Sequence, residues 1–142
     1  MRCRRRRGAR AAPRSAPLKL TRRNPLSLAP PRSKGKIAAQ AGHAFLGAYR
    51  IAQRLPLARE WVKAWSARGC AKITLSIATE ADMIACSEAA LAAGLPSLVI
   101  EDAGRTEVAA GTRTVCAIGP APVQLIDALT GKKGRFACRL LE

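Results

Sequence analysis

Large aromatic rings and histidine are scarce in this chain of 142 residues, which contains two Trp, two Phe, one Tyr and one His. Alanine is abundant instead, which favours closely packed helices over a core of large rings. The five cysteines show no C-x-x-C spacing, and with one histidine they offer no ligand set for a structural zinc ion. We therefore predict reduced thiols, with Cys86 and Cys116 in the core, and we expect neither a metal nor a cofactor.

The sequence also lacks an apolar run that approaches the roughly 18 to 20 residues of a membrane-spanning helix. It has no G-x-S-x-G motif and no cysteine close in sequence to its histidine, which are the usual signs of an activated nucleophile. We therefore expect no membrane partner. These absences argue against a covalent intermediate on a serine or cysteine side chain.

Acidic residues are missing from the first 59 positions. Residues 1–36 hold thirteen Lys and Arg, so most of the formal net charge of +16 belongs to them. Such a segment binds polyanions in a salt-dependent way, and its composition is also typical of an organelle transit peptide. Because residues 1–32 are rich in Pro as well, we predict that they are disordered and that residues 33–142 form one domain.

Hydrophobic periodicity predicts an α/β protein. Apolar residues between Lys36 and Leu55 recur with a helical period, whereas residues 72–78 alternate with a period of two. Thr79 to Asp82 has the form of a capping box, so a helix is expected from there to about Gly94. The predicted helices cover 36–55, 57–65, 79–94 and 122–129, and the predicted strands cover 72–78, 97–101, 114–118 and 135–141. This order indicates helices layered on a mixed sheet.

Four short motifs follow one another: Gly35-Lys36 to His43-Ala44, Asp102 to Thr106, Gly111 to Thr114, and Ile118 to Pro122. In this order and at this spacing they resemble the peptidyl-tRNA hydrolase type 2 family, over roughly residues 33–131. The resemblance implies a three-layer α/β/α fold with a mixed, roughly four-stranded sheet.

The first strand of that family has no clear counterpart in this sequence. Residues 17–31 contain several prolines and no continuous apolar run, and a central strand cannot easily lose its amide donors. Either the strand is missing or a weak Leu18–Leu20 segment replaces it.

The resemblance implies that Lys36, Asp102, Thr106 and Thr114 form the catalytic set. Lys36 lies at the predicted start of a helix, where a cation is best placed if an anion or oxyanion occupies that helix end. Asp102 is suited to orient or deprotonate water or to hold Lys36 in place, and a turn-capping role is its alternative. The two threonines are suited to bond the ester or water, or to cap the local backbone.

Lys34, Gln40, His43 and Arg105 are the predicted tRNA-binding residues. Gln40 and His43 align with Lys36 on the side of the helix that is not apolar. Arg105 suits a phosphate contact, with pairing to neighbouring glutamates, Glu101 or Glu107, as its alternative. His43 is either a general base or part of an ordinary solvated face.

The resemblance implies hydrolysis of the ester bond between peptide and tRNA, with peptidyl-tRNA as the partner and a homodimer left open. The expected location is cytoplasmic or mitochondrial, with a plastid as a further option, because the N-terminal segment resembles a transit peptide. The alternative is a catalytically impaired member of the family that acts as an RNA-binding or regulatory interaction protein.

Overall fold

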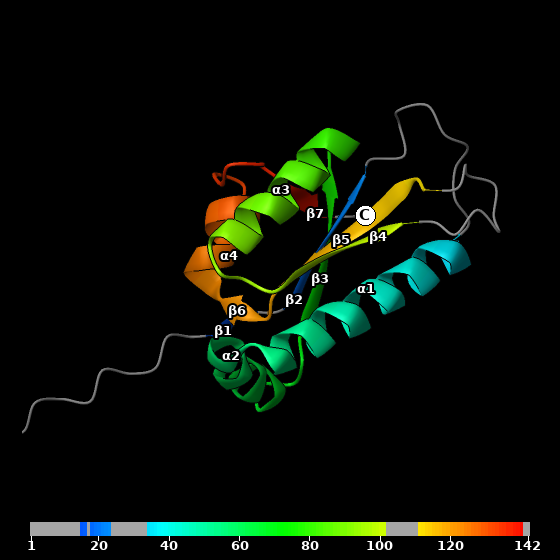
Figure 1. The fold of residues 1–142 in the computed structure, drawn as a ribbon. Coiled ribbons are helices and arrows are strands. Elements are labelled where there is room, and N and C mark those ends of the chain that lie inside the picture. The colour runs from blue at the N-terminus through cyan, green and yellow to red at the C-terminus, as the bar shows by residue number, and fades with distance from the viewer. Residues whose placement is uncertain (1–14, 17, 24–33, 102–110, 141–142) are drawn as a thin grey trace, which may run out of the picture.

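A mixed five-stranded sheet with helices on both faces forms the body of the molecule (Figure 1). The structure is a computed structural model that describes residues 15–16, 18–23, 34–101 and 111–140. Its strand order is β4-β5-β2-β3-β7, and β1 and β6 pair separately as a two-stranded ribbon. The elements are β1 Ser15–Ala16, β2 Leu18–Arg23, α1 Lys34–Arg54, α2 Pro56–Ser66, β3 Lys72–Ile77, α3 Glu80–Ala92, β4 Ser97–Glu101, β5 Arg113–Ile118, β6 Ala121–Pro122, α4 Val123–Thr130 and β7 Arg139–Leu140.

The central strand of the sheet is β2. It pairs in parallel with β3 along its whole length, from Leu18 opposite Lys72 to Arg23 opposite Ile77. On its other side it pairs antiparallel with β5, from Lys19 opposite Ile118 onward. The first strand of the family is therefore present, and it extends beyond the Leu18–Leu20 segment that the sequence offered as its replacement.

Two expectations about the sheet are corrected. Residues 15–16 and 18–23 belong to the sheets, so the prediction that the whole of 1–32 is disordered is wrong for them. The sheet also gains a fifth strand, because the two-residue β7 pairs with β3 at the edge. A strand bonded on both edges is held by its neighbours and does not need a long apolar run of its own, and Pro17 and Pro25 lie outside its bounds.

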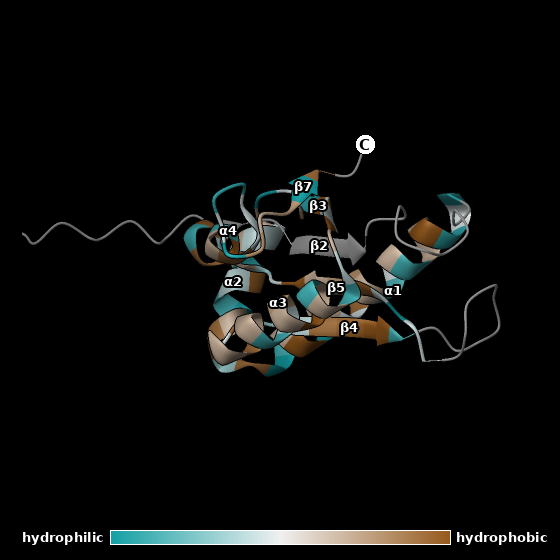
Figure 2. Ribbon diagram, turned by 90° about the horizontal axis from the view of Figure 1, so that it is seen from above, coloured by the Kyte–Doolittle hydropathy of each residue, from teal (hydrophilic) through white to brown (hydrophobic). Residues whose placement is uncertain are grey.

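The two helical layers follow from the alternation of side chains along β5. Val115 and Ala117 belong to the apolar cluster beneath α1, whereas Cys116 and Ile118 belong to the cluster beneath α3. In Figure 1, α1 and α2 lie on one face of the sheet and α3 and α4 on the other. In Figure 2, most of β4 and β5 carries the brown of apolar residues. The three-layer prediction is confirmed.

Small side chains bring α1 close to the sheet. Its fully buried residues are Ala44, Ala48 and Ala52, which recur every fourth position. A Cβ atom at Gly47 would collide with the side chain of Leu98 in β4, so the glycine leaves room for that leucine. The buried face of this helix is therefore a single line of alanines, which is narrower than the predicted apolar face. Leu55, which was predicted to belong to that face, is exposed.

The other predicted helices and strands occur within a few residues of their expected bounds. The expected start of this helix is confirmed, because Thr79 is its N-cap and Thr79 Oγ1 accepts a hydrogen bond from the backbone N–H of Asp82 at 3.0 Å. Pro122 stands directly before α4 and Gly131 directly after it, as expected. None of the helices in the described part of the chain has the combination of length and apolar character that a membrane span requires.

Three free cysteines, Cys86, Cys116 and Cys138, lie buried in the cluster beneath α3 and α4. The core positions predicted for Cys86 and Cys116 are confirmed. Burial, with the other two thiols nearby, raises the pKa of the Cys86 thiol to about 12 from its ordinary value of 9.0.

Stability is therefore expected to fall at alkaline pH through Cys86. The unfolded chain loses this proton near pH 9 while the folded chain keeps it to about pH 12, so the contribution is complete below pH 9 and is lost between these values. The loss is at most about 1.4 kcal/mol per pH unit. Urea unfolding between pH 8 and pH 11 should show a steeper decline for the wild type than for Cys86→Ala, and parallel declines would contradict the assignment.

Candidate functional site

The ammonium group of Lys36 is buried in the first turn of α1. A cation at this end of a helix meets the positive end of the helix dipole, and a buried charge is costly unless opposite charge lies against it. The first turn of α1 contains no acidic residue that would offset the dipole. The positive end of the helix dipole and the ammonium both favour negative charge beside them.

Thr114 links the start of β5 to α1 and β4. Its side chain is buried, with 3% exposed, and its Oγ1 lies 3.2 Å from Gln40 Oε1 and 3.3 Å from the carbonyl oxygen of Ile100. The hydroxyl has a single proton, which it can donate to either of these two acceptors. Because Gln40 follows Lys36 by one helical turn, the structure brings Lys36, Gln40 and Thr114 to the same flank of α1.

The remaining candidates on α1 lie at the surface. The side chains of Lys34 and His43 are exposed, Lys34 at the first position of α1 and His43 on the side of the helix that faces solvent. Both positions are accessible to a large substrate.

Three candidates, Asp102, Arg105 and Thr106, lie outside the described residues. The strands on either side of them are described: β4 ends at Glu101, and β5 begins at Arg113, next to Thr114. Along the chain, these candidates therefore lie between β4 and β5, and Thr114 near the start of β5 makes the contact with Gln40.

An ion pair that the sequence did not predict joins these two strand ends. Arg113 Nε lies 3.3 Å from Glu101 Oε1, beside a register irregularity between Ile100 and Glu101. From the sequence alone, Glu101 was one of two possible partners in the alternative interpretation of Arg105. Once the strand register is known, this pair can be expected, because opposite charges lie opposite each other on two antiparallel strands. Both side chains are about half exposed, so the pair is worth about 1 kcal/mol or less.

Basic residues greatly outnumber acidic ones in the part of the chain that forms α1, α2 and β3. Residues 34–79, which include α1, α2 and β3, contain eight Lys and Arg and one acid, Glu60. That acid is paired with Lys63 at 2.7 Å. By contrast, α3 carries Glu80, Asp82 and Glu88 and no basic residue. A polyanion would therefore be attracted to the layer of α1 and α2.

The described residues contain no group of three or more His, Cys, Asp or Glu side chains that could hold a metal ion. The groups that the site brings together are an ammonium, a carboxamide and a hydroxyl. They can donate to or orient an ester and water, and they can stabilise developing negative charge.

Comparison with known proteins identifies the family. The model of the family "Peptidyl-tRNA hydrolase PTH2" matches residues 23–133, which include all four motifs. The probable peptidyl-tRNA hydrolase 2 of Schizosaccharomyces pombe is 46% identical over 104 residues, which are 73% of this chain and 50% of the relative.

Two other relatives are also named as peptidyl-tRNA hydrolases. The peptidyl-tRNA hydrolase 2, mitochondrial, of Homo sapiens is 43% identical over 99 residues, 69% of this chain and 54% of the relative. The peptidyl-tRNA hydrolase of Metallosphaera sedula is 40% identical over 98 residues, 69% of this chain and 84% of the relative. The matched part of the chain thus spans about half the length of these eukaryotic relatives and most of the archaeal one. Because the family match extends over more than half of the sequence, the chain belongs to the peptidyl-tRNA hydrolase type 2 family.

Proposed function

We propose that this chain hydrolyses the ester bond between peptide and tRNA in peptidyl-tRNA and releases free tRNA and an N-substituted amino acid or peptide. The observation that carries the proposal is the buried ammonium of Lys36 at the start of α1, one turn from Gln40 and its hydrogen bond to Thr114. The names of the relatives support it, since each is called a peptidyl-tRNA hydrolase.

In the proposed reaction, water adds to the ester carbon, the bond to the ribose oxygen breaks, and that oxygen takes up a proton. Lys36 stabilises the negative charge that develops on the carbonyl oxygen. Asp102 orients the attacking water and accepts its proton, and Thr106 hydrogen-bonds the ester or the water. These steps use only water and side chains of the chain.

Thr114 acts in this proposal through Gln40. Its hydroxyl is buried and already lies against two acceptors, so it holds the carboxamide of Gln40 beside Lys36 instead of reaching the ester. The exposed residues Lys34 and His43 contact the tRNA, and Arg105 contacts a phosphate.

Thr114→Val tests this positioning role, because valine keeps the shape of the side chain and removes the hydroxyl. We expect kcat to fall by about tenfold to a hundredfold as Gln40 loses its anchor. The free energy of unfolding should fall by about 1 to 3 kcal/mol, because buried acceptors lose their donor. Steady-state kinetics and urea unfolding measure the two effects, and Thr114→Ser is the control that should restore both. Unchanged kcat in the valine variant would remove Thr114 from the mechanism.

The reaction itself is tested with two substrates that differ at one group, N-acetyl-aminoacyl-tRNA and the same aminoacyl-tRNA with a free α-amino group. The proposal predicts cleavage of the N-blocked substrate with little action on the free one. A folded protein that binds tRNA but cleaves neither substrate would support the alternative, an impaired family member that acts as an RNA-binding or regulatory protein.

We also propose that the protein acts in the cytoplasm or in mitochondria, with plastids as the remaining option. The acid-free, Arg-rich N-terminal sequence supports an organelle, and the human relative is named as mitochondrial. A homodimer remains part of the proposal, and light scattering of the purified chain tests it.

A further inference from the structure

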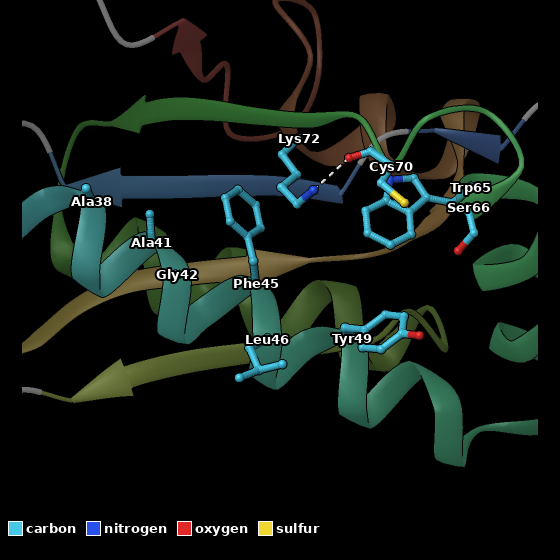
Figure 3. A pocket seen from close by; sticks show the side chains of 10 residues that line it. All are labelled: Ala38, Ala41, Gly42, Phe45, Leu46, Tyr49, Trp65, Ser66, Cys70 and Lys72. Atoms are coloured by element: carbon cyan, nitrogen blue, oxygen red, sulfur yellow. Dashed lines mark hydrogen bonds between the residues drawn. The ribbon is translucent and has the colours of Figure 1, made fainter.

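A groove of about 580 Å³ lies between α1, the end of α2 and the start of β3 (Figure 3). Phe45, Leu46 and Tyr49 line it from α1, Trp65 from α2 and Lys72 from β3. It lies on the opposite flank of α1 from Gln40 and Thr114, because Gln40 faces β5 whereas the groove opens toward β3. The groove is therefore separate from the candidate catalytic site.

Three aromatic side chains, those of Phe45, Tyr49 and Trp65, are among the residues that line the groove. Tyr49 and Trp65 pack with their ring centroids 6.1 Å apart and their planes tilted by 45°. The indole N–H of Trp65 donates to the carbonyl oxygen of Ala71 at 2.8 Å, which fixes the ring in place. Phe45 and Tyr49 are only half-buried, and Leu46 is 49% exposed, so apolar surface is left open to a ligand.

A cation lies beside the aromatic rings of the groove. The ammonium of Lys72 is 5.1 Å from the centroid of the Trp65 ring and donates to the carbonyl oxygen of Cys70 at 2.9 Å. The surrounding layer carries basic residues, and its single acid, Glu60, is paired with Lys63. A ligand that matches both the aromatic rings and the cation has flat apolar groups and negative charge.

Unpaired RNA is the ligand class with this combination, because its bases stack on aromatic side chains and its phosphates meet Lys and Arg. We propose that the groove binds an unpaired nucleobase from the 3′ end of the tRNA, stacked against Phe45 and Tyr49. The inference rests on the proposed function in taking tRNA as the RNA.

The distance between the two sites is short enough for one RNA end to reach both. At about 1.5 Å per helical residue, Phe45 lies roughly 14 Å along α1 from Lys36. Between the two flanks of α1, the exposed residues Ala38, Ala39 and Gly42 are small, and the larger exposed side chain on this stretch is that of His43, which the proposed function assigns to tRNA contact. The ribose that carries the ester can therefore lie at Lys36 while a neighbouring base lies in the groove.

The test compares binding of deacylated tRNA with binding of the same tRNA trimmed of its unpaired 3′ nucleotides. Wild type should bind the intact form about tenfold more tightly, the range expected for one stacked base. Phe45→Leu keeps an apolar side chain but removes the ring, so it should bind intact tRNA about tenfold more weakly and trimmed tRNA as wild type does. Phe136→Leu, the same change in the other layer, should leave both affinities unchanged.

A second pair of variants uses exposed leucines, so that folding does not limit the test. Leu46→Glu places negative charge in the groove and should abolish the preference for intact tRNA, whereas Leu91→Glu on α3, where the leucine is 55% exposed, should not. Equal melting midpoints confirm that each variant is folded.

Four outcomes would overturn the proposal. Full discrimination between intact and trimmed tRNA in Phe45→Leu and Leu46→Glu would exclude the groove. Weaker binding of N-acetyl-aminoacyl-tRNA by Phe45→Leu, with unchanged binding of deacylated tRNA, would assign the groove to the peptide. Dissociation of a dimer without an effect on RNA binding would assign the groove to a second copy of the chain.

Because deacylated tRNA carries no ester, absence of hydrolysis does not affect this result. Absence of any tRNA binding would overturn the proposed function as well.

Discussion

Removal of residues 1–23 is expected to abolish the cooperative unfolding transition, whereas removal of residues 1–14 should leave the melting midpoint unchanged within a few degrees. The longer deletion takes away β2, which carries ladder hydrogen bonds on both edges and joins β3 to β5. Total stabilities of domains are about 5 to 15 kcal/mol, so loss of the central strand exceeds what the remaining core can compensate.

Thermal melts of chains 15–142 and 24–142, followed by circular dichroism, measure this difference. The shorter deletion also removes seven Arg and no acid, so chain 15–142 should show a flatter salt dependence of RNA binding and the same rate of hydrolysis. A cooperative melt of chain 24–142 at the wild-type midpoint would show that the sheet does not depend on β2.

Lys36→Ala is expected to lower kcat by roughly a hundredfold or more, with a much smaller change in KM. In the proposed mechanism its buried ammonium meets negative charge that is present only in the transition state, so its loss affects the chemical step more than substrate binding. Asp102→Asn should have a comparable effect. Steady-state hydrolysis of N-acetyl-aminoacyl-tRNA by variants with equal melting midpoints measures both.

His43→Ala is the control on the same helix. Its side chain is exposed, so the expected effect is a modest rise in KM. If His43→Ala lowered kcat more than Lys36→Ala at unchanged stability, the roles assigned to the two residues would be wrong.

Elements with local signals were predictable from the sequence. The alternation in β3 and the capping box of α3 depend on residues within a few positions of one another, and both were found where expected. β2 was only partly predictable, because its segment has few apolar residues and is held by β3 and β5, which lie about 50 and 100 positions further along the chain. Such long-range pairing leaves little trace in the residues of the strand itself.

The same distinction applies to the candidate site. The alignment of Lys36 and Gln40 follows from their spacing on one helix. The bond from Thr114 to Gln40 joins residues 74 positions apart, and only the order of motifs indicated that they meet. The Glu101–Arg113 pair depends on a register that shifts at the end of β4, and the aromatic groove depends on how α1 and α2 meet β3. Neither was predictable from periodicity.

The central claim is that this chain turns over peptidyl-tRNA, and the most direct measurement is the amount of tRNA released from N-acetyl-aminoacyl-tRNA in substrate excess. The account predicts release that continues linearly over many equivalents of wild-type protein, and release at least about a hundredfold slower with Lys36→Ala. Release by folded wild-type protein at no more than the spontaneous rate would contradict it.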